Sequence, residues 1–334
     1  MKNKIILIFT LLVFASAPAF SQPQIQDIQN AANKFSEDVT VAIPFNSTIG
    51  LNWSDAYIGQ LIGVPPHFGI GISTGFTTLG TGSIDGILNA IGGGAQNAIP
   101  SFLRGMGMPL PAYTVEGRIG GFILPFDIGF KFGILPLDLQ EFAIDYLLIG
   151  VDVRYAVIDH KLSPIKLSVG VGYNYMKGGI TIPIGDASFQ LTEGGQTYTF
   201  SLNDPKIGFI WGTHCFELKG QVSFKLPFIT PYAGAGLSMA FSNAGYRFSS
   251  NLSVATGGSP VDINDPIIQD ALKALGISNI TENGFGSIID STSFNMRLFG
   301  GISFNLALFR IDLSVMYNLT GGNYGFTIGG RFQL

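Results

Sequence analysis

The stretch that decides the fold is Asn323–Leu334, NYGFTIGGRFQL, which alternates apolar with small or polar residues up to the last position. One parity carries Tyr324, Phe326, Ile328, Phe332 and Leu334, and the other carries Gly325, Thr327, Gly329, Arg331 and Gln333. Because successive side chains of a strand point to opposite faces, the stretch predicts a β-strand with one apolar and one small or polar face. Soluble β-sandwiches and membrane barrels both use strands of this kind.

Within this strand, Thr327, Gly329, Phe332 and Leu334 have the spacing polar-x-Gly-x-x-apolar-x-apolar. This spacing resembles the C-terminal signal of bacterial outer-membrane β-barrel proteins. Members usually have an aromatic residue at the last position, where this chain has Leu334. The resemblance implies an all-β, transmembrane, antiparallel up-and-down β-barrel whose last strand contacts the barrel-assembly machinery.

The first residues are typical of a secretory signal peptide, with two lysines ahead of an apolar run over residues 5–14. Cleavage after Ala19 or after Ser21 would satisfy the small-residue rule for signal peptidase. We therefore expect residues 1–21 to be a signal peptide that is removed on export. The expected destination is the cell outer membrane.

Charged residues make up only 12% of the chain, about half of their share in a typical soluble domain. Such an exterior is hard to solvate in water, whereas the lipid-facing side of a barrel requires few charges. Outside the signal peptide, no uncharged apolar run reaches the length of about 18 residues that predicts a transmembrane helix. The net charge is −4, or −6 once the two signal-peptide lysines are subtracted, which is too small to indicate nucleic-acid binding.

Residues 22–38 are expected to form an amphipathic helix that plugs the barrel lumen or caps its periplasmic mouth. Apolar residues recur there at helical spacing: Ile25, Ile28, Ala31, Ala32 and Phe35. From residue 39 the period of the pattern changes to two, so we expect the barrel over residues 39–334.

Alternating segments predict about twelve strands, within a range of ten to fourteen. The expected strands cover residues 39–52, 55–62, 67–79, 113–123, 126–134, 147–157, 165–175, 207–226, 231–241, 294–305, 309–318 and 323–334. An even number of strands returns both termini to the periplasm, with the long connections outside the cell. Two of those connections carry expected helices, over Ile84–Ile91 and Ile267–Leu275. The apolar parity changes within residues 207–226, which predicts a β-bulge near Thr213–Cys215.

The inward parity of these strands predicts a charged lumen. The expected lumen-lining residues are Glu116, Arg118, Asp127, Lys131, Asp152, Arg154, Lys166, Lys219, Lys225, Arg297, Arg310, Asp312 and Arg331. Nine of them are cations and four are anions. Such a lumen either holds a mildly anion-favouring aqueous path or is filled by ions that pair across it. A barrel of about twelve strands has room for water unless loops or the amino-terminal helix close it.

In its amino-terminal helix and its helical outer loops, the chain is similar to the long-chain fatty-acid transporter family of outer-membrane barrels. Members of that family have an amino-terminal hatch and a hydrophobic capture site among their outer loops. Their Asn-Pro-Ala motif near the hatch is absent here, so the resemblance implies no ligand residues. The two loop helices would either form an apolar pocket together or pack on themselves.

Catalytic and metal sites are not predicted. The three histidines are His67, His160 and His214, and no cluster of His, Cys or carboxylates has the spacing of metal ligands. His214 adjoins the single cysteine, Cys215, but adjacent strand residues face opposite sides unless a bulge intervenes. We expect no enzyme activity, no metal and no cofactor.

The favoured interpretation is an exported outer-membrane barrel that allows passive passage of small solutes, hydrophobic ones among them. One alternative is a non-conducting surface protein whose long loops bind partners, and another is a soluble secreted β-sandwich. The expected partners are outer-membrane lipids, the barrel-assembly machinery and a small or hydrophobic solute, with no nucleic acid. The oligomeric state is left open by the sequence.

Overall fold

The structure is a computed structural model that describes residues 25–62, 66–80, 107–134, 137–139, 142–160, 163–183, 187–193, 195–274 and 285–334. The expected signal peptide and the expected helix over residues 84–91 lie outside the described residues. The described elements are α2 (Ile25–Asn46), β1 (Phe68–Leu79), β2 (Met108–Gly120), β3 (Phe126–Ile134), β4 (Leu137–Leu139), β5 (Phe142–Ile158), β6 (Ile165–Pro183), β7 (Ala187–Glu193), β8 (Gln196–Phe224), β9 (Ile229–Thr256), β10 (Ser259–Val261), α5 (Pro266–Ala274), β11 (Phe285–Leu306), β12 (Phe309–Asn318) and β13 (Tyr324–Gln333).

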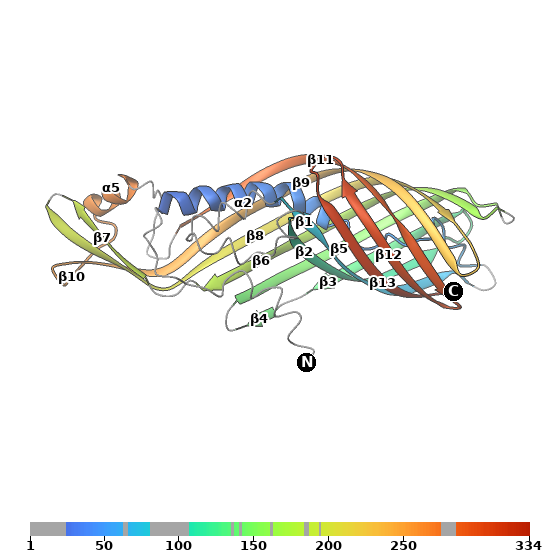
Figure 1. The fold of residues 1–334 in the computed structure, drawn as a ribbon, viewed down its shortest axis with the longest axis horizontal. Helices are drawn as coiled ribbons and strands as arrows, with labels where there is room; N and C mark the ends of the chain where they lie inside the picture. Colours follow the sequence, from blue (N-terminus) through green and yellow to red (C-terminus); the bar gives the residue numbers. More distant parts are fainter. Residues whose placement is uncertain are drawn as a thin grey trace.

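Ten of these strands form a closed antiparallel ring (Figure 1), in the order β1, β2, β3, β5, β6, β8, β9, β11, β12 and β13. β13 then pairs with β1, with Gly69 opposite Gln333 and Gly75 opposite Thr327. The stretch that predicted the fold is therefore the strand that closes the barrel. The short strands β4, β7 and β10 pair beside the ring, with β5, β8 and β9 respectively.

The outer face of the ring is apolar and ends in aromatic residues at two levels. Tyr317 and Tyr324 pack together with ring centroids 4.9 Å apart near the β12–β13 turn. At the other end of the same strands, Phe309 and Phe332 pack at 5.6 Å. Girdles of aromatic residues at both interfaces border the lipid-facing band of a membrane barrel, which is about 25 Å tall. On β12 and β13, the two pairs therefore lie at the two ends of the apolar band.

Three strands are far longer than a membrane requires. β8, β9 and β11 have 29, 28 and 22 residues, whereas about 9 to 11 residues span a bilayer. The surplus projects from the end opposite the C terminus, and β7, β10 and α5 lie at its tip (Figure 1). The helix expected over Ile267–Leu275 is α5 at this tip.

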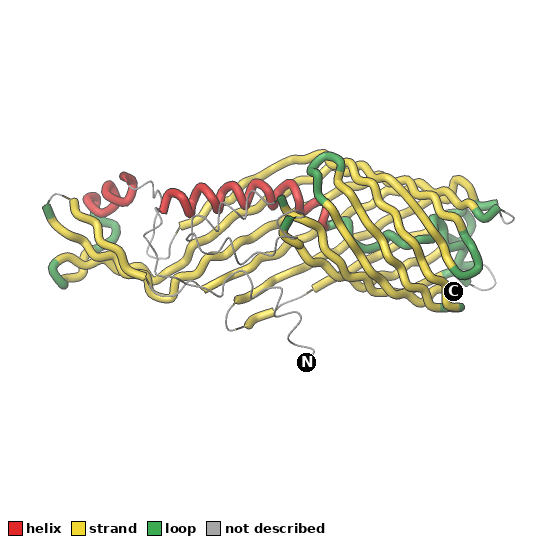
Figure 2. Tube along the Cα trace, viewed as in Figure 1, coloured by secondary structure: helices red, strands yellow, loops and turns green. Residues whose placement is uncertain are grey.

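The amino-terminal helix is longer than expected and lies at a different place. α2 runs along the strands at their projecting end, away from the short turns and the C terminus (Figure 2). Buried residues recur on it at helical spacing: Ala32, Phe35, Val39, Ala42 and Ile43. They pack against inward apolar residues of β8, β9 and β11, including Phe209, Tyr246 and Phe299. No helix among the described residues is long and apolar enough to cross a membrane.

The two strands expected over residues 39–52 and 55–62 do not form, which is why the ring has ten strands and not about twelve. Val39, Val41 and Ile43 alternate in the sequence, but Val39 and Ile43 are also one helical turn apart, and Val41 is 41% exposed on the helix. After α2, residues 47–60, called the luminal segment here, run through the lumen without regular structure.

The bulge expected near Thr213–Cys215 is also absent, because β6 and β8 keep one register through these residues. The register shift within β8 lies between Asn203 and Lys206. The parity changes in the sequence because Phe209 is an apolar residue on the inner face, where its ring packs at 4.7 Å against that of Phe35 of α2. Farther along β8, the inner face carries polar residues and the outer face apolar ones.

Candidate functional site

The lumen is the candidate site, and the luminal segment enters it at the outer rim of the ring. The Asn46 amide donates to the Thr77 hydroxyl at 2.9 Å, which attaches the end of α2 to the end of β1. Just below, the Lys131 ammonium on β3 donates to the carbonyls of Ser47 and Ile49, at 2.7 Å each. A buried cation on the wall thus holds the first turn of the segment.

A sharp turn at Gly50 and Leu51 directs the chain farther down. Both residues have positive φ, +87° and +59°, and a side chain at Gly50 would lie 2.7 Å from the Thr114 hydroxyl. At position 50, glycine adopts the positive φ without strain and has no side chain to clash with Thr114. Beyond the turn, one oxygen of Glu116 on β2 accepts from the Leu51 amide at 2.8 Å and from the Trp53 indole at 2.6 Å.

Asp55 lies deeper in the lumen and binds the last two strands of the ring. Its carboxylate pairs with Arg310 and, at 2.9 Å, with Arg331. Arg331 also pairs with Asp312 at 2.7 Å. From the other side of the ring, Arg154 donates to the Asp55 carbonyl at 2.7 Å. Both the side chain and the backbone of this residue are therefore held by the wall.

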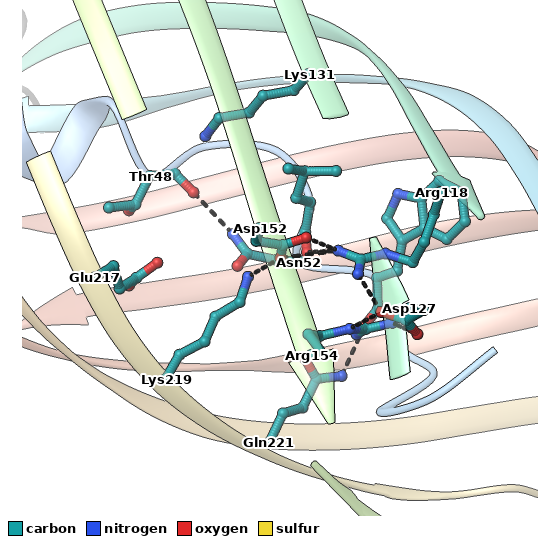
Figure 3. Close-up of polar contacts among 12 residues, drawn as sticks. Thr48, Asn52, Arg118, Asp127, Lys131, Asp152, Arg154, Glu217, Lys219 and Gln221 are labelled. Atoms are coloured by element: carbon teal, nitrogen blue, oxygen red, sulfur yellow. Dashed lines mark hydrogen bonds and ion pairs between the residues drawn. The ribbon is translucent and has the colours of Figure 1, made fainter. Parts of the chain in front are cut away.

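A second ion network joins β2, β3, β5 and β8 (Figure 3). Arg118 pairs with Asp127 and donates to both oxygens of Asp152, at 2.8 and 2.9 Å. Arg154 forms two parallel bonds to Asp127, at 2.9 and 2.8 Å, and Lys219 pairs with Asp152 at 2.7 Å. These side chains are at most 4% exposed. Bidentate arginine–carboxylate pairs are among the strongest hydrogen-bonded contacts in proteins.

Side chains of β8 and β11 also contact the luminal segment. Glu217 pairs with Arg297, and Arg297 donates to the Asn52 amide oxygen at 3.1 Å. Gln221 donates to the Trp53 carbonyl at 2.7 Å. The segment is therefore held by side chains of β2, β3, β5, β8, β11, β12 and β13.

Most of the lumen-lining residues expected from the sequence lie in these networks. Nine of them are buried: Glu116, Arg118, Asp127, Lys131, Asp152, Arg154, Lys219, Arg297 and Arg331. Arg310 and Asp312 are partly buried. Lys166 pairs with Asp159 of the adjoining turn at 2.6 Å, and Lys225 follows the end of β8 and is exposed. These two lysines lie at the short-turn rim, outside the buried networks.

Two further buried carboxylates, Asp55 and Glu217, are not among the residues expected from the sequence. Asp55 falls in an expected strand that does not form, and the expected bulge obscures the parity that Glu217 shares with Lys219. With both included and the two rim lysines removed, the interior holds seven cations and six carboxylates among the described residues. The charges therefore nearly balance, as expected for ions that pair across a filled lumen.

The residues expected to form the C-terminal signal lie on both faces of β13. Thr327 faces inward and shares a hydrogen bond with Ser314, and Gly329 also lies on the inward parity, opposite Ser73 of β1. Phe332 faces outward against Phe309. The Leu334 amide donates to the Phe68 carbonyl at 3.0 Å, so the terminal residue extends the pairing with β1.

His214 and Cys215 lie on opposite faces of β8. Cys215 is fully buried inside the ring, whereas His214 is on the outer face, where Nδ1 is 2.8 Å from the Tyr173 hydroxyl. The pair therefore has no geometry for thiol catalysis. Within the described part of the chain, no three His, Cys, Asp or Glu residues group where they could hold a metal ion.

A closed ring with an apolar outer face and aromatic pairs at both ends of β12 and β13 is the architecture of a bacterial outer-membrane β-barrel protein. A family model described as Lsa36-like matches residues 62–334, which include all ten strands of the ring. The chain belongs to the Lsa36-like family. No curated protein matches this Lsa36-like chain.

Several solved outer-membrane barrels resemble the Lsa36-like chain at low identity. The outer-membrane protease OmpT from Escherichia coli is 10% identical, with 81% of this chain and 97% of that chain covered and a TM-score of 0.38. The CymD monoaromatic hydrocarbon channel is 8% identical over 95% and 99% of the two chains, with a TM-score of 0.28. The translocator domain of the autotransporter NalP from Neisseria meningitidis is 8% identical over 80% and 88%, with a TM-score of 0.27. At this level of similarity, the activities of these proteins are not assigned to this chain.

Proposed function

We propose that this Lsa36-like protein is a closed outer-membrane barrel that displays α2 and the extensions of β8, β9 and β11 at the cell surface, where they bind partners. The role is one of binding, and no catalysis is assigned. The observation that carries the proposal is the course of the luminal segment. It is bonded to the ring from its first residue, Ser47, whose carbonyl accepts from Lys131, to the β2–β3 turn, where the Gln60 amide donates to the Ile123 carbonyl at 2.6 Å.

The burial of the wall supports a lumen closed to water. Arg118 and Arg154 are 0% and 1% exposed, so these side chains are shielded from solvent. An open pore would leave such side chains hydrated. Removing one partner of a buried ion pair costs about 3 to 5 kcal/mol. The ion networks therefore favour keeping the luminal segment inside the barrel over a spontaneous opening of the lumen.

The orientation follows from the general rule that short turns of a bacterial barrel face the periplasm and long connections face outward. Under this rule α2 and the strand extensions are extracellular. The same proposal includes export through a cleaved signal peptide. It also includes insertion through contact of β13 with the barrel-assembly machinery, and outer-membrane lipid around the apolar outer face of the ring.

The tip of the extension is a candidate contact surface. Asp265 caps α5, since its carboxylate accepts from the Ile267 amide at 2.9 Å. Ile263, which precedes α5, and Ile268 within it are buried, while the Ile267 side chain is 54% exposed. The tip therefore presents a capped helix with Ile267 on its exposed side, which a partner could contact.

Single-channel recording in a planar bilayer tests the closed lumen. The refolded mature protein is expected to give no stable current steps, and a variant that lacks residues 22–60 is expected to give them. The heat-modifiable gel shift of a folded barrel checks both proteins. Stable steps in the complete protein would overturn the proposal, whatever the deletion variant does.

Passive passage of small hydrophobic solutes is the second candidate. Its support is the apolar inner wall around α2, which includes Leu148, Met176 and Phe299. Withdrawal of α2 would expose this wall as an apolar vestibule. Liposomes containing the protein would then take up a small aromatic compound faster than protein-free liposomes, and a cross-link between α2 and β8 would abolish the difference.

A further inference from the structure

The outer face of the ring has a depression of about 300 Å³ across β8, β9 and β11. His214, Phe241 and Thr292 form one cross-strand row of it, with His214 opposite Phe241 and Phe241 opposite Thr292. In the next row outward, Asn243 lies opposite Asp290. These five side chains are exposed and line the depression.

A missing side chain leaves room beside Asn243. Its neighbour on β8 is Gly212, where a Cβ atom would lie 3.2 Å from the Asn243 amide oxygen. Any larger residue would press on the amide. The glycine therefore keeps the Asn243 side chain open to a ligand.

The depression adjoins the apolar outer surface of the ring. The row below it consists of the exposed apolar residues Phe216, Met239 and Phe294. Beside it on β6, Tyr173 binds His214 through its hydroxyl and Tyr175 packs on the imidazole at 4.8 Å. Aromatic residues of this kind sit at the level of lipid headgroups. The polar groups therefore face the headgroup region of the outer leaflet.

We propose that this depression binds the sugar headgroup of an outer-leaflet glycolipid. Asp290 accepts hydrogen bonds from hydroxyl or amino groups, and Asn243 and Thr292 both donate and accept. With Nδ1 of His214 engaged by Tyr173, Nε2 is the ring nitrogen that a sugar hydroxyl would meet. Neither lysine nor arginine lines the depression as the structure describes it, which disfavours a phosphate group as the recognised feature.

Native mass spectrometry of the refolded protein, released from phosphatidylcholine nanodiscs that contain dephosphorylated lipid A, tests this site. The complete protein is expected to retain one glycolipid. Asp290→Ala is expected to lower the retained fraction about tenfold, the effect of losing a hydrogen bond to a charged group. Asp145→Ala is the matched control, because Asp145 is also exposed on the outer face, on β5 opposite Gly179.

Each of the following results with lipid would overturn the assignment: equal retention by Asp290→Ala and the complete protein, an equal loss in Asp145→Ala, or equal retention of phosphatidylglycerol, which has no sugar. A soluble glucosamine disaccharide that competes as strongly as the glycolipid would show that the occupant is a free sugar and would also overturn it. The gel shift confirms that each variant is folded.

Discussion

Asp55 and Arg331 are 276 residues apart in the sequence, yet their side chains meet at 2.9 Å inside the barrel. Asp55 belongs to the luminal segment, and Arg331 belongs to β13, the strand that closes the ring. The contact therefore links the filling of the lumen to the closure of the wall. A change at either residue should affect both, and this relationship gives the first prediction.

Asp55→Asn leaves Arg310 without its carboxylate partner and Arg331 with only Asp312. We expect the free energy of unfolding in lipid vesicles to fall by about 3 kcal/mol, since an uncompensated buried charge remains. Urea titration followed by tryptophan fluorescence measures it. The control is Asp159→Asn, which removes an exposed pair with Lys166 and should cost no more than about 0.5 kcal/mol. Equal effects of the two changes would contradict the role given to Asp55.

Gly50→Ala should disturb the turn at the top of the luminal segment. The φ of +87° disfavours alanine, and its Cβ would lie 2.7 Å from the Thr114 hydroxyl. We expect a loss of about 2 kcal/mol in the same titration. At Gly257, φ is also positive, at +55°, but no atom lies within 4 Å of the Cβ position. Gly257→Ala should therefore cost only about 1 kcal/mol, the backbone part of the effect.

Phe35→Ala removes the ring that packs against Phe209 and leaves a cavity between α2 and β8. The expected cost is about 3 kcal/mol, concentrated in α2, so hydrogen exchange of the α2 amides should accelerate while that of β13 stays unchanged. Val41→Ala alters an exposed position of the same helix and should leave exchange as it is. Unchanged exchange in Phe35→Ala would argue against packing of α2 inside the extension.

Cys215 offers a test of the filled lumen without any substitution. Its side chain points into the ring and is 0% exposed, so a water-soluble maleimide should not modify the folded protein. Modification should become complete after unfolding in urea. Rapid labelling of the folded protein would mean that water and small solutes reach the inner face of β8.

The placement of α2 predicts which side of the membrane it faces. In a Cys215→Ser background, Lys34→Cys on the exposed side of α2 should react with an impermeant maleimide on intact cells. Lys225→Cys, at the short-turn end of β8, should react only after the outer membrane is permeabilised. The reverse pattern would invert the proposed orientation.

Local sequence patterns predicted the ring well because alternation along a strand reports which face meets lipid and which faces inward. Each of the ten ring strands contains a segment that showed this period, and Arg118, Asp152 and Arg331 have the inward positions expected of their parity. The pattern did not predict β4, β7, β10 or the extensions of β8, β9 and β11. The pattern failed at residues 39–52, where alternation and helical spacing coincide, and at Phe209, where the inner face is apolar because a helix packs on it.

The sequence by itself determined the barrel, its closing strand and most of the inward charges on its strands, because these depend on the alternation of side chains along a single strand. Only the tertiary structure decided that the lumen is filled and by which residues. Its contacts join positions far apart in the chain, such as Asn52 with Arg297 and Asp55 with Arg331. Burial of an ion depends on the partner that meets it in space, and no local period encodes that partner.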